Sequence, residues 1–87
     1  MVPLEEIRKN LGKETMLIGQ NQTIKNLKLG KVEKVFLASN CKPSVRNDIE
    51  YYCKLNKIPL IILEIPNDEL GIVCKKHFAI SVICFLK

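Results

Sequence analysis

The sequence lacks the features of several large classes of protein. No apolar run approaches the ~18 residues of a membrane-spanning helix, so we expect no membrane partner. The N-terminal stretch MVPLEEIRKN is charged and amphipathic and has no apolar segment of a secretory signal, which predicts a cytoplasmic protein. A P-loop and a dinucleotide-binding glycine fingerprint are also absent, which argues against a nucleotide cofactor.

Histidine and closely paired cysteines, the usual carriers of catalysis and metal binding, are scarce. The one histidine, His77, has no local signature of a Cys–His pair, so an enzyme is the weaker hypothesis. The four cysteines at positions 41, 53, 74 and 84 form no C-x-x-C pair, which disfavours structural zinc. Three of them lie in apolar runs, where cysteine acts as a small hydrophobic residue. We therefore expect buried free thiols, no catalytic residue, no metal and no cofactor.

The remaining pattern predicts one α/β domain over residues 1–87. Apolar residues make up 47% of the chain, and neither a linker nor a repeat divides it. Helical periodicity or helix-start signals mark residues 3–11, 20–29, 43 onward and 66–74; apolar runs typical of strands mark 15–19, 33–39, 58–65 and 79–86. Alternating strands and helices predict a three-layer α/β/α sandwich around a small four-stranded mixed sheet with mostly parallel strands.

The positive charge is confined to one third of the sequence. Residues 15–47 hold six basic residues and one acidic residue, whereas the rest of the chain holds eight of each. A localised basic segment in a balanced domain is typical of a surface that binds a polyanion, although a solvated lysine-rich surface has the same composition.

Within this segment, the stretch GQNQTIKNLKLGK (residues 19–31) concentrates amides and lysines. Asn21, Lys25 and Lys28 follow one another at i, i+4 and i+7, which places them on one stripe of a helix, while Ile24 and Leu27 point to the core. Such a stripe carries an amide able to read a base edge and two ammonium groups able to contact phosphates. The alternative is that Gln20 or Asn21 only caps the helix and that the lysines are solvated.

Three stretches of the sequence, GQNQTIK, NCKPSVRNDIEYY and NDELG, match motifs of a known group of proteins. They resemble the kink-turn RNA-binding ribosomal protein superfamily, most closely its large-subunit L thirty-e family of archaea and eukaryotes. GQNQTIK is similar to the G-x-N-E-x-x-K stretch of the superfamily. NCKPSVRNDIEYY has an asparagine after the second strand, a proline opening the next helix, and DIEYY within that helix. NDELG is similar to the N-x-E-L-G element that precedes the last loop. The resemblance runs from about Leu4 to Leu86.

The resemblance implies a structural RNA-binding protein of the large ribosomal subunit that recognises a kink-turn, a sharply bent RNA element with tandem sheared G·A pairs. The helix start would contact those pairs, and an apolar loop would cover an extruded base. The implied RNA-binding residues, together with the lysine of the stripe, are Gly19, Gln20, Asn21, Gln22, Lys25, Lys28, Asn40, Phe78, Ala79 and Ile80. We expect Phe78 to be exposed and Ile80 to be partly buried, because two lysines and a histidine directly precede them.

Two features of the sequence leave other functions open. Gln22 stands where the wider superfamily carries a glutamate, and Gln22 with Thr23 departs from the L thirty-e pattern toward the paralogue that also serves guide-RNA particles. The alternatives are therefore a kink-turn-binding subunit of a non-ribosomal RNA-guide or RNA-processing particle, and a protein-interaction module. Retention of Asn21 and Lys25 argues against the second. The expected partners are a ribosomal RNA kink-turn and other ribosomal components, with a monomer off the ribosome.

Overall fold

Helices and strands alternate along the chain, as the sequence pattern predicts. A computed structural model of the protein describes residues 3–87. Its elements are, in order, α1 (Pro3–Lys9), β1 (Met16–Ile18), α2 (Gln20–Lys28), β2 (Val32–Leu37), α3 (Pro43–Asn56), β3 (Leu60–Ile62), α4 (Asn67–Val73) and β4 (Val82–Leu86). None of the helices in the described residues is long and apolar enough to cross a membrane.

The four strands form one mixed sheet in the order β1-β4-β2-β3. β4, the last strand, lies between β1 and β2 and is antiparallel to both, whereas β2 and β3 are parallel. The mixed sheet is thus confirmed, but the expected majority of parallel strands is wrong. The reason is that the short segment after α4 returns β4 into the middle of the sheet in the opposite direction, instead of extending its edge.

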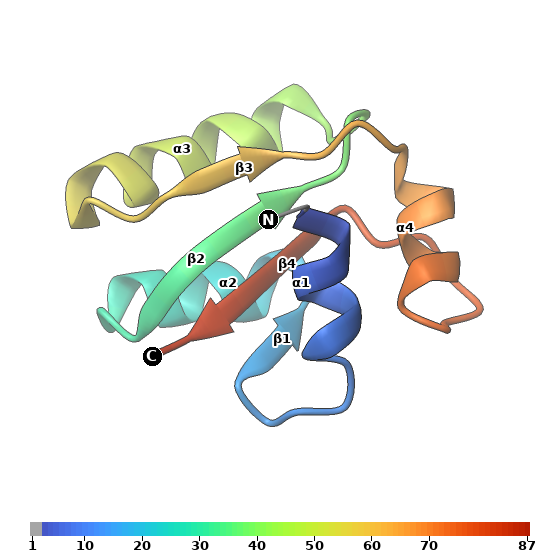
Figure 1. Cartoon of the computed structure of the whole chain (residues 1–87). Helices are drawn as coiled ribbons and strands as arrows, with labels where there is room; N and C mark the ends of the chain where they lie inside the picture. The colour runs from blue at the N-terminus through green and yellow to red at the C-terminus, as the bar shows by residue number, and fades with distance from the viewer. Residues whose placement is uncertain (1–2) are drawn as a thin grey trace.

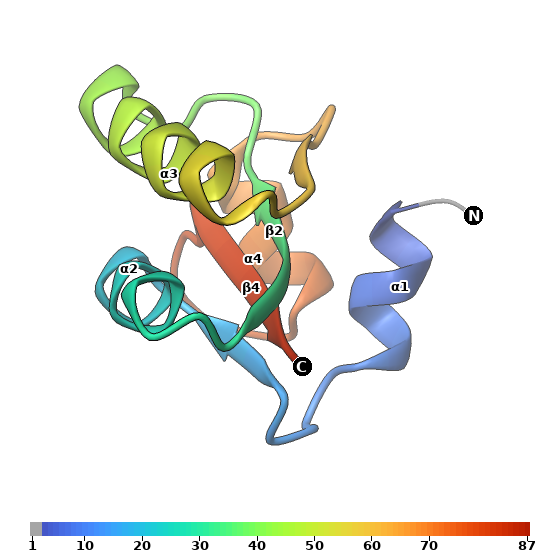
Figure 2. The same ribbon diagram turned by 90° about the vertical axis from the view of Figure 1, so that its left-hand side faces the viewer.

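Helices cover both faces of this sheet, which confirms the three-layer sandwich. Seen along the sheet, α2 and α3 lie on one side and α1 on the other (Figure 2). Successive residues of β2 point to opposite faces: Phe36 packs with α1 and α4, whereas Val35 and Leu37 pack with α2 and α3. β2 lies between β4 and β3 in the sheet (Figure 1). Its alternating side chains therefore contribute to two separate hydrophobic clusters, one on each face of the sheet.

Two of the apolar runs form shorter strands than expected. The run at 58–65 contributes only Leu60–Ile62, because β3 is an edge strand that pairs with β2 alone, and Ile62 is exposed on it. The run at 79–86 begins as a strand only at Val82. Residues 78–81 are consequently a loop, and this loop reaches the carboxyl end of β2 near the start of α2.

α3 begins as the sequence predicts and ends at a residue the pattern did not mark. Pro43 occupies the first turn, and Lys57 at positive φ closes the helix. Arg46 Nε donates to Glu50 Oε1 at 2.8 Å, one turn along the exposed face. Glu50 therefore pairs with the residue one turn before it on α3.

Candidate RNA-binding site

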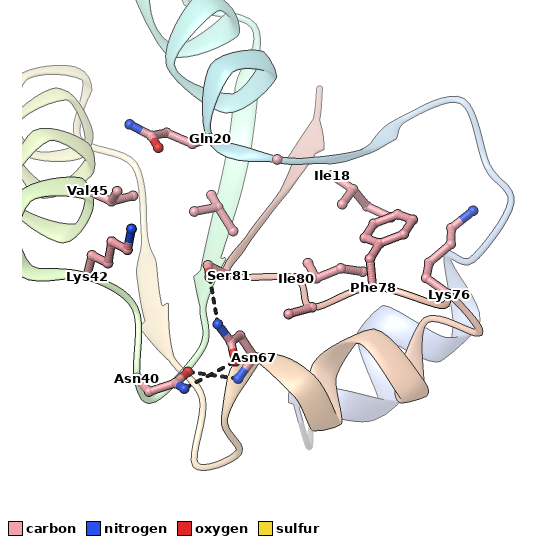
Figure 3. A pocket seen from close by; sticks show the side chains of 13 residues that line it. Ile18, Gln20, Asn40, Lys42, Val45, Asn67, Lys76, Phe78, Ile80 and Ser81 are labelled. Atoms are coloured by element: carbon pink, nitrogen blue, oxygen red, sulfur yellow. Dashed lines mark hydrogen bonds between the residues drawn. The ribbon is translucent and has the colours of Figure 1, made fainter.

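A cleft of about 630 Å³ opens where the ends of β1 and β2 meet the starts of α2 and α4. Figure 3 shows side chains from these elements and from the loop at 78–81 around this cleft, with Gln20 and Lys42 toward one end and Phe78 beside Ile18 toward the other. Its lining includes Gly19, Gln20, Asn40, Asn67, Phe78, Ala79, Ile80 and Ser81. Residues far apart in the sequence thus converge on one end of the sheet.

The start of α2 presents backbone donors to this cleft. Gly19 is the N-cap, at φ +112°, and no side chain caps the helix. The first helical bond runs from the Thr23 amide to the Gly19 carbonyl, so the amides of residues 20–22 have no helical acceptor. Free N–H groups at a helix N-terminus favour an anion or an oxygen acceptor. The alternative in which Gln20 or Asn21 caps the helix is therefore not the arrangement that the structure adopts.

The predicted stripe on α2 is present beside the cleft, not inside it. Asn21, Lys25 and Lys28 are exposed and line one shallow groove along the helix. Lys28 also lies over the ring of Tyr52 in α3, with Nζ 5.5 Å from the ring centroid. A cation held over an aromatic ring keeps its charge at a defined place on the surface.

The core side of α2 differs in one residue from the expected pattern. Leu27 is buried as predicted, but Ile24 is only half-buried, and Thr23 takes a fully buried position. The buried Thr23 hydroxyl has no hydrogen-bond partner among the described residues. It lies near the Cys84 thiol of β4, whose pKa is raised by burial.

A pair of asparagines among the lining residues joins the segment after β2 to the start of α4. Asn40 Nδ2 donates to Asn67 Oδ1 at 3.1 Å, and the Asn67 amide donates to Asn40 Oδ1 at 2.8 Å. Asn67 Nδ2 reaches Ser81 Oγ at 3.4 Å (Figure 3). These bonds make Asn40 a connecting residue as well as a lining residue. Pro66 is the N-cap of α4, and the Asn67 side chain bonds Asn40 and Ser81 instead of capping the helix.

The loop at 78–81 divides its apolar residues between solvent and core. Phe78 is 59% exposed, as predicted, whereas Ile80 is only 2% exposed and belongs to the hydrophobic cluster between the sheet and α4. The expected partial burial of Ile80 is wrong: its amide donates to the Asn67 carbonyl at 3.0 Å, which turns the side chain into the core despite the charged residues upstream. Ala79 is exposed beside Phe78.

Gly71 of α4 is what lets this loop lie against the helix. A Cβ at position 71 would overlap the carbonyl oxygen of Phe78, and the Lys76 amide donates to the Gly71 carbonyl at 2.9 Å. The glycine of the NDELG motif therefore fixes how far Phe78 stands from the helix.

The cysteines give the site no reactive chemistry. Cys53, Cys74 and Cys84 are buried free thiols, as expected, and Cys41 is a half-buried one. Burial, reinforced by neighbouring Cys84 and Glu50, raises the pKa of Cys53 to about 11, which keeps it a neutral thiol near pH 7. Within residues 3–87, no group of three potential metal ligands comes together.

The structure brings some of the predicted site residues into the cleft and leaves others on the adjacent helix surface. The cleft contains Gly19, Gln20, Asn40, Phe78, Ala79 and Ile80; Asn21, Gln22, Lys25 and Lys28 lie outside it on α2. Sequence reasoning missed the other lining residues, which are Ile18, Lys42, Val45, Asn67, Lys76, Ser81 and Val82. Asn67 could have been found, because the NDELG motif that carries it was recognised.

Comparisons with known proteins identify a family and a fold to which the chain is similar. A profile described as the Ribosomal protein L7Ae/L30e/S12e/Gadd45 family matches residues 3–87. The chain is 37% identical over 81 residues to the large ribosomal subunit protein eL30 of Methanopyrus kandleri, covering 93% of this chain and 74% of that protein. It is 43% identical over 68 residues to the eL30 of Methanothermobacter thermautotrophicus, covering 78% and 69%.

Two solved structures share the fold at lower sequence identity. A protein of unknown function from Bacillus halodurans has a TM-score of 0.86 at 23% identity, covering 97% of this chain and 83% of that one. A 15.5kD RNA binding protein from Giardia lamblia has a TM-score of 0.83 at 21% identity, covering 97% and 70%. At these identities the likeness concerns the fold alone.

Proposed function

The chain belongs to the Ribosomal protein L7Ae/L30e/S12e/Gadd45 family, and from this premise we propose that it is a structural RNA-binding protein of the large ribosomal subunit. The eL30 proteins to which it is similar are named as components of that subunit. Its place of action is then the cytoplasmic ribosome, its partners are ribosomal RNA and neighbouring ribosomal components, and catalysis is no part of the role.

The RNA feature that we propose as the target is a kink-turn. The observation that carries this is the convergence of an uncapped helix start and an exposed aromatic loop on one cleft. A sheared G·A pair turns polar base edges outward, where the amides of residues 20–22 and the Asn21 side chain can donate and accept. A base that the bend extrudes is then available to stack on Phe78.

Each group around the cleft has a separate task in this proposal. Lys25 and Lys28 contact phosphates along the outer stripe, which positions the RNA without reading its sequence. Asn40 and Asn67 hold the end of β2 and the start of α4 together. This connection keeps the Phe78 loop at a fixed distance from α2. The cleft volume of about 630 Å³ is enough to admit one nucleobase.

A kink-turn RNA and a fully paired duplex of equal length and charge provide the direct test. We expect tight binding of the kink-turn, weak and strongly salt-dependent binding of the duplex, and loss of this preference in Asn21→Ala. Equal affinity for the two RNAs would refute the kink-turn proposal.

Sedimentation separates the ribosomal role from that of a guide-RNA or processing particle. The similarity to named eL30 proteins favours the ribosome. We expect the protein to co-sediment with large subunits in a gradient at low magnesium, and RNA crosslinked to it to be ribosomal. Recovery in a smaller particle, with a guide RNA, would favour the alternative.

A further inference from the structure

A second cleft, of about 610 Å³, lies between the end of α1, the α1–β1 turn and the end of α4. Its basic residues are Arg8, Lys13, Lys75 and Lys76, and the described residues contribute no acidic side chain to its lining. Leu11, Met16 and Ile18 supply an apolar floor. We call this surface the basic cleft.

The basic cleft is not visible in the charge distribution along the sequence. All four of its cations come from the part of the chain outside residues 15–47, which holds eight basic and eight acidic residues. Folding separates these positive and negative charges. Four of the eight basic residues line this cleft, whereas Glu6 pairs with Lys34 and Glu50 pairs with Arg46 outside it. Of the remaining acidic residues, only Glu14 is a chain neighbour of a basic-cleft residue, and it is exposed.

The basic cleft adjoins the first cleft. Ile18 and Lys76 line both, and in Figure 3 the Lys76 side chain extends from beside Phe78 toward the α1–β1 segment. A ligand seated on Phe78 can therefore continue past Lys76 without leaving the protein surface. Helix-dipole interactions explain a preference for cations near the ends of α1 and α4, but they do not account for Lys13, which lies beyond α1 in the turn.

The turn that carries Lys13 is itself held in place. The Lys13 amide donates to the Asn10 carbonyl at 3.1 Å, and the Met16 amide donates to the Lys13 carbonyl at 3.1 Å. Lys75 is fixed at φ +58° directly after α4. Both lysines therefore project from defined backbone positions, with their side chains exposed.

We propose that the basic cleft binds the sugar–phosphate backbone of a helical arm that leaves the RNA element seated on the first cleft. This inference rests on the proposed function and extends the RNA footprint from the α2 start to the opposite side of the Phe78 loop. A regular polyanion suits a surface that combines several cations with apolar contacts for riboses. The contact reads backbone and not sequence, so it adds affinity for any arm of sufficient length.

The test compares three kink-turn RNAs: a minimal one with both arms short, and two in which one arm or the other is extended by about one helical turn. The variant Arg8→Gln, Lys13→Gln, Lys75→Gln removes three charges from the basic cleft and leaves Lys76, which also lines the first cleft. Lys54→Gln, Lys57→Gln, Lys87→Gln is the control, since it removes three exposed charges elsewhere. Unfolding midpoints of both variants establish that the fold is retained.

We expect extension of one arm to tighten binding by the wild-type protein, and the triple basic-cleft variant to lose that gain while binding the minimal RNA as before. At a slope of about −0.9 per phosphate, three contacts weaken about 40-fold between 50 and 200 mM salt, and this added salt dependence is lost in the variant. The control variant keeps it.

The inference is overturned if neither arm adds affinity, or if the two triple variants behave alike on every RNA. In both cases the minimal kink-turn still binds, so the proposed function stands. Failure of the wild-type protein to prefer the minimal kink-turn over a duplex is a different result, because it removes the proposed function and the inference together.

Discussion

Truncation of Phe78 and of Ile80 distinguishes a binding side chain from a core side chain two residues away. Phe78 is 59% exposed, so Phe78→Ala forfeits less than half of the roughly 1.5–3 kcal/mol that full burial of such a side chain provides, or about 1 kcal/mol. For a domain of this size, that loss lowers the melting temperature by roughly 4–8 °C. Ile80 is 2% exposed, and Ile80→Ala leaves a cavity that costs roughly 2–5 kcal/mol.

For RNA affinity we expect the opposite order: substitution of Phe78 weakens binding more than substitution of Ile80 does. Stacking of a base on an aromatic side chain contributes roughly 1–3 kcal/mol, so Phe78→Ala weakens binding of the kink-turn by about 5- to 160-fold. Ile80→Val keeps most of the core contact, costs roughly 0.5–1.5 kcal/mol of stability, and leaves affinity near that of the wild type. Phe78→Trp, which retains an aromatic surface, restores binding.

Urea unfolding and RNA titration on the same preparations provide the assay. Tyr51→Ala is a matched control, because Tyr51 is 62% exposed on α3 and lies outside the cleft. It loses a similar amount of exposed aromatic surface without losing affinity. If Phe78→Ala lowers the unfolding midpoint as much as Ile80→Ala does, or binds RNA as tightly as the wild type, then the assignment of Phe78 to RNA contact is refuted.

Local sequence pattern was sufficient to predict the elements and the outer surface of α2. Apolar spacing and helix-start signals located the eight helices and strands of the described residues, and the i, i+4, i+7 spacing placed Asn21, Lys25 and Lys28 in one groove. Both predictions concern residues that are close in sequence. Periodicity of 3.6 or 2 is a property of the local backbone, so it can be read without knowing what packs against it.

The direction and position of β4 could not be predicted in the same way. The apolar run VICFL predicts a buried strand, but it indicates neither the direction of that strand nor its place at the edge or in the centre of the sheet. The burial of Ile80 follows from that position, because Ile80 lies two residues before the central strand and packs in one hydrophobic cluster with Leu70 of α4. The two lysines and the histidine at 75–77 predicted only partial burial of Ile80, but tertiary packing outweighed them.

The basic cleft and the asparagine pair escaped sequence reasoning for a related reason. Each is assembled from segments that the chain separates: Asn40 and Asn67 are 27 residues apart, and Arg8 lies in α1 whereas Lys75 follows α4. Charge counted along the sequence averages over residues that folding later sorts to different surfaces. Only the topology, which brings the ends of α1 and α4 to one side of the sheet, makes these residues neighbours.

Three other substitutions test the remaining parts of the site. Asn21→Ala removes a donor and acceptor at the helix start, so we expect a loss of about 1–3 kcal/mol for the kink-turn and little change for a duplex, by titration of both RNAs. Lys25→Ala should reduce the salt slope of binding by about 0.7–0.9, whereas Lys54→Ala, on α3, should leave it unchanged. For Gly71→Ala, two physical effects oppose each other. Helix propensity alone favours alanine by about 1 kcal/mol in the interior of a helix. The added Cβ, however, overlaps the Phe78 carbonyl oxygen, which is backbone and can withdraw only if the whole loop moves. We therefore expect a lower unfolding midpoint together with weaker RNA binding, because displacement of the loop moves Phe78 from the cleft. A more stable variant with unchanged affinity would mean that the loop is not held against α4 in this way.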